Sequence, residues 1–111
     1  MKKLQPILLL FFILFSTSLF AQRSEQNLID EGVVLHDSGE YKQAIEKYQQ
    51  VLSFNPHSLQ AIYEMALSYL ELKDYEKAME YSTRVIDADD ENLSVLAYCV
   101  KSGALAEMNQ L

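Results

Sequence analysis

The sequence predicts an all-α fold, in which antiparallel helical hairpins repeat along the chain. From residue 26 onward the apolar residues recur at steps of three and four, which is the period of an α-helix. The stretch GEYKQAIEKYQQVLSFNP, which begins at Gly39, returns 34 residues later as KDYEKAMEYSTRVIDADD, which begins at Lys73. A chain that repeats one helical unit buries the apolar side of each unit against the next unit.

The first 21 residues predict a secretory signal peptide. Two lysines at positions 2 and 3 precede the apolar run ILLLFFILF, and Ala21 stands before the polar Gln22. A positive start, an apolar run of roughly 7–15 residues and a small residue at the end are typical of such a peptide. We therefore expect cleavage after Ala21, export of residues 22–111, and a periplasmic or secreted location. The alternative is a retained membrane anchor, although a spanning helix needs about 20 apolar residues.

The composition limits the kind of partner that the exported part can have. The net charge is −7 at pH 7, and loss of the signal peptide removes two lysines and no acid. An acidic chain disfavours nucleic acids and anionic lipid surfaces, and it favours basic or neutral partners. Because Cys99 is the only cysteine, an internal disulfide and a cysteine-rich metal site are excluded.

The first predicted hairpin has a recognisable turn and a recognisable end. Its first helix ends at Gly39, because glycine readily takes the left-handed conformation that closes helices. Its second helix ends at Asn55, because the following Pro56 restricts its neighbour and donates no backbone hydrogen bond. The apolar stripes of the two helices are Leu28, Gly32 and Leu35, and then Tyr41, Ala44, Ile45, Tyr48, Val51 and Leu52.

The second predicted hairpin repeats this plan, and a fifth helix follows it. Ser58 is expected to accept a hydrogen bond from a free amide at the start of the third helix. Lys73 stands where Gly39 stood, and a left-handed lysine costs about 1 kcal/mol, so we expect a looser second turn. The stripes are Ile62, Ala66 and Tyr69, then Tyr75, Ala78, Met79, Ser82, Val85 and Ile86, and then Tyr98, Leu105 and Met108.

The spacing of these residues resembles the tetratricopeptide repeat family from Glu25 to Leu111. The first copy fits the family pattern with Leu28, Gly32, Leu35, Tyr41, Ala44, Tyr48 and Pro56. The second copy departs from it at Ser82 and Asp90, and the third aligns only with a two-residue insertion that puts Ser102 at the small position. The resemblance implies a right-handed α-solenoid with two full repeats, about 25–58 and 59–92, and the first helix of a third, 95–111.

The third repeat is predicted to leave apolar side chains exposed, because its helix has no partner helix of its own. Part of Tyr98, Leu105 and Met108 should then face solvent. One interpretation is self-association through this helix. Another is that the chain is the N-terminal repeat region of a larger enzyme or sensor protein.

Motifs that indicate catalysis are absent from the sequence. It has no glycine-rich phosphate loop, no HExxH and no nucleophile elbow, and its two histidines, His36 and His57, lie far apart. The acidic run DADDEN resembles a calcium loop only in part, because Asn92 stands where the sharp turn needs glycine. We therefore predict no catalytic residue, no metal site and no cofactor.

The resemblance points instead to a binding groove, because ligand peptides of this family usually lie along the first helix of each pair. The residues expected there are Ile29, Val33, His36, Tyr63, Glu64, Leu67, Leu70 and Cys99. The family's best-known subgroup grips a peptide carboxylate with basic residues and asparagine, which this chain lacks at these positions. An apolar floor with acidic walls indicates a protein or peptide partner with apolar anchors and basic flanks. The alternative is that this stripe packs between neighbouring helices.

Overall fold

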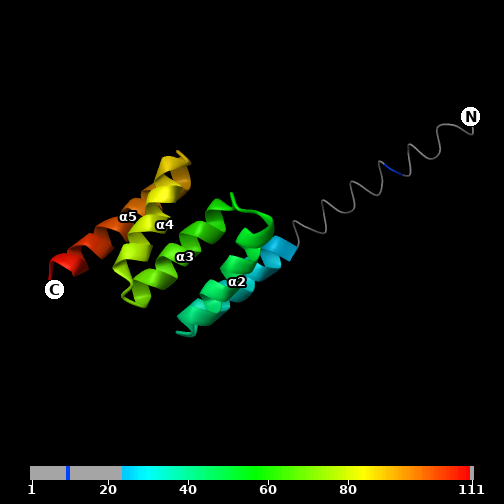
Figure 1. Ribbon diagram of the computed structural model, residues 1–111, viewed down its shortest axis with the longest axis horizontal. Coiled ribbons are helices and arrows are strands. Elements are labelled where there is room, and N and C mark those ends of the chain that lie inside the picture. The colour runs from blue at the N-terminus through cyan, green and yellow to red at the C-terminus, as the bar shows by residue number, and fades with distance from the viewer. Residues whose placement is uncertain (1–9, 11–23, 111) are drawn as a thin grey trace, which may run out of the picture.

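The computed structural model describes residue 10 and residues 24–110. Residues 24–110 contain five helices and no strand: a first helix over residues 24–37, α2 (Tyr41–Phe54), α3 (Leu59–Glu71), α4 (Tyr75–Asp87) and α5 (Glu91–Asn109). The helices run back and forth, each beside its neighbour in the chain (Figure 1). The predicted all-α fold of repeated hairpins is confirmed. The predicted signal peptide, residues 1–21, lies outside the described residues except for Leu10.

The turns inside the two hairpins are closed by the same hydrogen bonds, 34 residues apart. After the first helix, Gly39 has φ 81°, and the Glu40 amide donates to the carbonyl of Leu35 at 2.8 Å. After α3, Lys73 has φ 63°, and the Asp74 amide donates to the carbonyl of Tyr69 at 2.9 Å. Both are Schellman motifs, which satisfy carbonyls that the helix leaves free. The expectation of a looser second turn is therefore wrong, because Lys73 accepts the left-handed backbone.

Short polar side chains fix the starts of the later helices. The Ser58 hydroxyl accepts from the Ala61 amide at 3.4 Å, as predicted. Asp74 accepts from the Lys77 amide at the start of α4, and Asp90 accepts from the Leu93 amide at 3.0 Å at the start of α5. Each bond satisfies an amide that has no partner within its own helix.

Small residues bring the helices of each hairpin close together. Gly32, Ala44, Ala66 and Ala78 are all buried. In the first hairpin the ring of Tyr48 lies directly against Gly32, so that a Cβ added to Gly32 would overlap Cε1 of the ring and lie 2.7 Å from Cζ. The backbone of the first helix therefore forms part of the niche that holds this ring.

The third repeat is open on the side where a partner helix would lie. Ala97 and Ala104, which stand 36 residues after Ala61 and Ser68, are buried as those two residues are. The counterparts of the buried Ile62, Ala66 and Tyr69 on the same register are Tyr98, Ser102 and Leu105, and all three are exposed. The positions of the buried residues in α5 thus match the alignment that contains the two-residue insertion, in which each residue of α5 corresponds to the residue 36 positions earlier. Among the described helices, none covers the exposed side.

Candidate functional site

One face of the molecule is formed by the first helices of the hairpins, and we call it the inner face. It is defined by the helix over residues 24–37, α3 and α5. A hydrogen bond of 2.9 Å between His36 Nδ1 and the Ser68 hydroxyl joins the first helix to α3. A Cβ added to Gly103 of α5 would lie 3.8 Å from a methyl group of Leu70, so α5 packs on the other side of α3.

The apolar residues predicted for this face are half-buried rather than free in solvent. Val33, Tyr63, Leu67 and Leu70 all pack against the core and keep part of their surface exposed. None of them is among the strongly exposed large hydrophobic residues of the described chain. Each of these side chains therefore packs against the core and also contributes to the surface.

Ile29 does not belong to this surface. Its side chain is 1% exposed and lies in the core cluster with Ala44 and Tyr48. The prediction that Ile29 faces a ligand is wrong, because the hairpin packing rotates this position toward α2. Ile29 is therefore a core residue, and a ligand on the inner face would not contact it.

His36 and Cys99 have different surroundings on the inner face. The His36 ring is held by Ser68 on one side and packs edge-on against Tyr41, with ring centroids 5.0 Å apart. This histidine therefore connects the two hairpins. Cys99 of α5 is exposed with a free thiol. Burial, and then Glu64 and Cys99, raise the pKa of Tyr63 of α3.

Glu64 of α3 is a half-buried carboxylate on the inner face. Burial, and then the negative charge of Asp37, raise the pKa of Glu64 above its ordinary value. The same two carboxylates act on Tyr48 of α2: burial, then Glu64, then Asp37 raise the pKa of its phenol. Burial and nearby negative charge both disfavour the ionised form of Glu64.

The Tyr48 hydroxyl is a group that the sequence does not single out as functional. The residue is 0% exposed, and its hydroxyl has no hydrogen-bond partner in the structure. Spacing correctly predicts Tyr48 in the core, but spacing does not reveal the surroundings of a hydroxyl. The replacement of Tyr48 by Ser82 in the second repeat is the available signal that this position is unusual.

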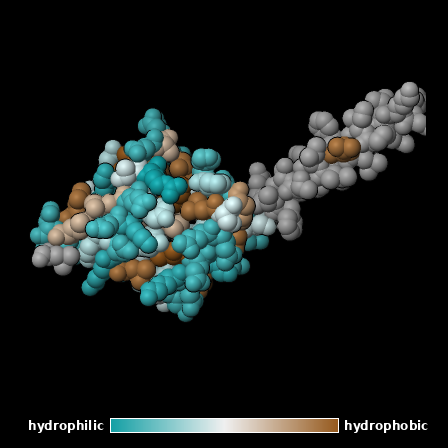
Figure 2. Space-filling model, viewed as in Figure 1, coloured by the Kyte–Doolittle hydropathy of each residue, from teal (hydrophilic) through white to brown (hydrophobic). Residues whose placement is uncertain are grey.

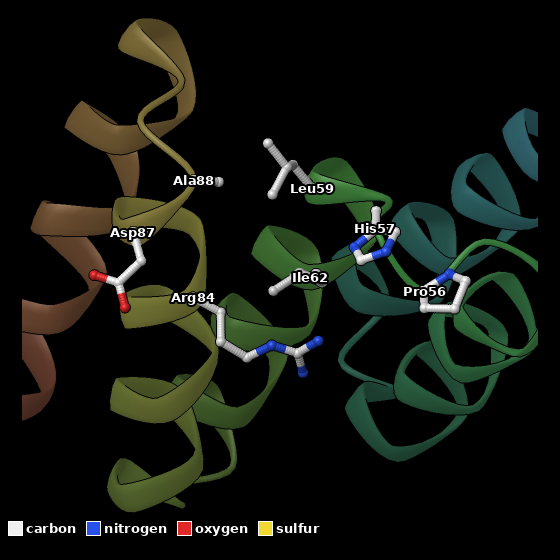
Figure 3. A pocket seen from close by; sticks show the side chains of 7 residues that line it. All are labelled: Pro56, His57, Leu59, Ile62, Arg84, Asp87 and Ala88. Carbon is white, nitrogen blue, oxygen red and sulfur yellow. The ribbon is translucent and has the colours of Figure 1, made fainter.

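A pocket of about 430 Å³ lies away from the inner face, between the α2–α3 turn and the end of α4 (Figure 3). It is lined by Pro56, His57, Leu59, Ile62, Arg84, Asp87 and Ala88. In Figure 3 the side chain of Arg84 extends toward α3, whereas the carboxylate of Asp87 points away from it. The guanidinium of Arg84 lies 5.4 Å from the centre of the Tyr81 ring. A reacting centre requires polar groups that converge on one point, and the polar side chains of this pocket do not converge.

Strongly exposed hydrophobic side chains are found on α5. Val95, Leu96, Tyr98 and Leu105 are between 44% and 64% exposed, and Met108 is half-buried. The predicted exposure of Tyr98 and Leu105 is thus confirmed. The view in Figure 2 shows hydrophobic surface as separate areas between hydrophilic side chains. Exposed apolar area of this kind usually marks a contact site.

Two searches of the described residues were negative. No three histidine, cysteine, aspartate or glutamate side chains in that part of the chain come together as metal ligands would. No described helix combines the length and the apolar character needed to cross a bilayer.

Comparison with known proteins identifies the family. A family model described as tetratricopeptide repeat matches residues 35–98, which is more than half of the chain. Among curated proteins no match was found. The matched segment includes the left-handed residues Gly39, Lys73 and Asp89, and the whole of α2, α3 and α4. The chain therefore belongs to the tetratricopeptide repeat family.

Proposed function

We propose that the chain is an exported tetratricopeptide-repeat module that binds a peptide or protein segment on its inner face and has no catalysis of its own. Tetratricopeptide repeats are in general protein–protein interaction modules. The single observation that carries the choice of surface is the row of half-buried apolar side chains, Val33, Tyr63, Leu67 and Leu70. They are fixed by the core, and they still present apolar area to a ligand.

The charge of this surface supports a partner with basic flanks. Asp37 and Glu64 border the apolar row, and the whole chain is acidic. A segment with apolar anchors and basic neighbours would cover the apolar row and at the same time reduce the repulsion between the carboxylates. Export is supported by the two lysines and the apolar run at the N-terminus, which are typical of a signal peptide.

The proposal is tested by selecting displayed random peptides on the full chain and measuring the affinity of the enriched peptides. Tyr63→Ala and Leu67→Ala should each weaken binding by about 1–2 kcal/mol, as central interface residues do. Phe54→Ala is the matched control, because Phe54 is an exposed large hydrophobic residue at the end of α2. Equal loss in all three variants, or no loss in any, would contradict binding on the inner face. Thermal melting shows whether each variant is folded.

A second candidate function is self-association through α5. It is favoured by the exposure of Val95, Leu96, Tyr98 and Leu105 on one helix. Sedimentation of the full chain at several concentrations tests this candidate. If the chain forms a dimer, Leu105→Glu should shift it toward the monomer. A chain that sediments as a monomer at all concentrations would exclude this candidate.

A further inference from the structure

One side of α5 is exposed, although the equivalent side of α3 is covered. We call it the open side, and its exposed residues are Val95, Tyr98, Ser102 and Leu105. Tyr98 and Leu105 are 55% and 44% exposed, whereas their counterparts 36 positions earlier, Ile62 and Tyr69, are 3% and 8% exposed. α3 is covered there by α4, the second helix of its hairpin, and no described helix takes the equivalent place beside α5.

The contacts between α3 and α4 show what kind of helix covers such a side. The ring of Tyr69 stacks on the ring of Tyr81, with the centroids 5.5 Å apart and the planes at 7°. Ile62 lies in one buried cluster with Val85, which is 0% exposed. Because α5 continues the same repeat, the open side continues an interface that the second hairpin already contains. A helix that resembles α4 would therefore fit on it.

The size of Ser102 adds a steric condition. The first hairpin combines Gly32 with Tyr48, and at the equivalent positions the second hairpin combines Ala66 with Ser82. Ser102 of α5 stands at the position of Gly32 and Ala66. Since even a Cβ at Gly32 would overlap the Tyr48 ring, a serine in this place is expected to exclude a tyrosine opposite it. The covering helix must carry a small residue there, as α4 does.

The other end of the row of helices has a different surface. On the first helix, the positions 34 residues before the buried Ala61, Met65 and Ser68 are exposed, and they hold Asn27, Glu31 and Val34. Two of these three residues are polar, and Glu31 is paired with Lys47 at 3.0 Å. The four residues of the open side include no charged group. Terminal repeats usually carry a polar outer face, so the open side has the character of a contact surface instead.

We propose that the open side of α5 binds an amphipathic helix of a second protein, and that this helix completes the third hairpin. The helix has the pattern of α4: a tyrosine, an alanine three residues later, a small residue four later and a valine three after that, as in Tyr75, Ala78, Ser82 and Val85. The open side is distinct from the apolar row of the inner face, and the proposal does not depend on a ligand there.

A second copy of this chain covers the open side less well than a helix of another protein. The α2 and α4 helices of the copy are already used, because their small residues Ala44 and Ala78 are 0% exposed. Its α5 would bring the large Tyr98 and Leu105 in place of the small residues of α4. Each copy also has a net charge of −7, which opposes association with itself and favours a neutral or basic partner.

The test uses a synthetic peptide with the sequence of residues 74–88, which contain α4. A staple between positions 76 and 80, both exposed on α4, keeps the peptide helical. Fluorescence anisotropy of the labelled peptide, titrated with the full chain, should show saturable binding. Tyr98→Ala and Leu105→Glu in the full chain should each raise the Kd at least about tenfold, as central interface residues do.

Leu96→Glu is the matched control. Leu96 is another exposed leucine of α5, 46% exposed, and it lies about 200° around the helix from Tyr98. This variant should leave the Kd unchanged. Thermal melting shows that each variant is folded, which is expected because the substituted side chains are exposed.

A second peptide tests the steric condition. The peptide of residues 40–54, stapled at the equivalent positions 42 and 46, carries Tyr48 where the first peptide carries Ser82. It should bind about tenfold more weakly, because the ring meets Ser102. Ser102→Gly in the full chain should recover this loss. Equal binding of the two peptides to the wild type, or no recovery in Ser102→Gly, would overturn the requirement for a small residue.

The remaining outcomes decide between the possible occupants. No saturable binding of the peptide of residues 74–88, or an equal loss in Leu96→Glu and Leu105→Glu, would overturn binding on the open side. A dimer in sedimentation that Leu105→Glu dissolves and that excludes the peptide would assign the open side to a second copy and overturn the choice of another protein. The proposed function fails separately, since it depends on Tyr63 and Leu67.

Discussion

The two complete hairpins share one backbone plan but solve the same packing problem with different pairs of residues. In the first hairpin a glycine, Gly32, faces a tyrosine, Tyr48. At the equivalent positions of the second hairpin, Ala66 and Ser82 are both buried. Gly32, which has no side chain, makes room for the large ring of Tyr48. The slightly larger Ala66 is combined with the small Ser82. Both pairs are buried, so the repeat keeps the burial of these two positions and not the residue at either one.

The difference also decides where a polar group is left without a partner. The Ser82 hydroxyl donates to the carbonyl of Ala78 at 2.6 Å, within its own helix. The Tyr48 hydroxyl reaches beyond its helix and has no partner. At this position the second hairpin has a bonded hydroxyl, and the first has a buried hydroxyl without a partner in the described structure.

A large effect on this comparison is expected from Gly32→Ala. The added methyl group overlaps the buried Tyr48 ring, and overpacking of this kind costs about 2 kcal/mol. Urea denaturation measures the loss of unfolding free energy. The matched control is Gly103→Ala, whose Cβ meets Leu70 at 3.8 Å, an ordinary contact. That variant should gain about 0.5–1 kcal/mol, because alanine favours a helix more than glycine does.

When Gly32→Ala is combined with Tyr48→Ser, the first hairpin receives the alanine and serine pair of the second hairpin. Tyr48→Ser alone leaves a cavity and should cost about 3 kcal/mol. In the double variant the methyl group added by Gly32→Ala no longer meets a ring, so the two losses should not add. A double-mutant cycle with a favourable coupling of about 1 kcal/mol or more is expected. Simple additivity would show that the pairing of Gly32 with Tyr48 is not the cause.

The turns are expected to respond next. Lys73→Gly should stabilise the protein by about 1 kcal/mol, because it removes the cost of a left-handed lysine at φ 63°. Gly39→Ala should destabilise it by about the same amount, because it adds that cost at φ 81°. Thermal and urea unfolding of both variants give the comparison. Changes of the same sign in the two variants would contradict equivalent turns.

Tyr48→Phe should stabilise the free protein by up to about 1 kcal/mol, since it removes a buried hydroxyl that has no partner. Ser82→Ala removes a hydroxyl that is already bonded to a helix carbonyl, and its effect should stay within about 0.5 kcal/mol. Calorimetry of the two variants measures the difference between the hairpins. A loss of stability in Tyr48→Phe would show that the hydroxyl has a partner in the free protein.

The smallest expected effect is the pH dependence caused by Glu64. Its pKa in the folded protein lies above the ordinary 4.5, because of burial and of Asp37. Between these two values the folded chain binds more protons than the unfolded chain, so the contribution of Glu64 to stability falls as the pH rises through that interval. The pKa values of Tyr48 and Tyr63 are raised above their ordinary value, so both side chains stay neutral in this interval.

Glu64→Gln should remove this contribution. The melting temperature of the variant should therefore gain on that of the wild type as the pH is raised from below 4.5 to neutrality. Melting curves at a series of pH values provide the measurement. A constant difference between the two proteins across this range would contradict the raised pKa of Glu64.

The hairpins, the small residues at their interfaces and the Ser58 cap can be predicted from the sequence, because each depends on spacing or on local hydrogen bonding. The prediction for Ile29 is wrong because one residue step rotates a helix position by about 100°, and the direction of the neighbouring helix decides which side is covered. The bond between His36 and Ser68 joins residues 32 positions apart, and the sequence offers no local signal for it. The expectation of a looser turn at Lys73 is wrong because the two backbone hydrogen bonds that close this turn outweigh the strain of one left-handed residue.

The matched turns at Gly39 and Lys73 have a consequence for how such a chain grows. The backbone hydrogen bonds that close each turn all join residues of the same hairpin. A duplicated gene segment encoding one hairpin would therefore bring its own closure with it and would demand a new fit only along its flanks. The number of hairpins in this architecture is therefore easy to alter. A change in ligand preference can begin in one hairpin while the others keep the fold stable.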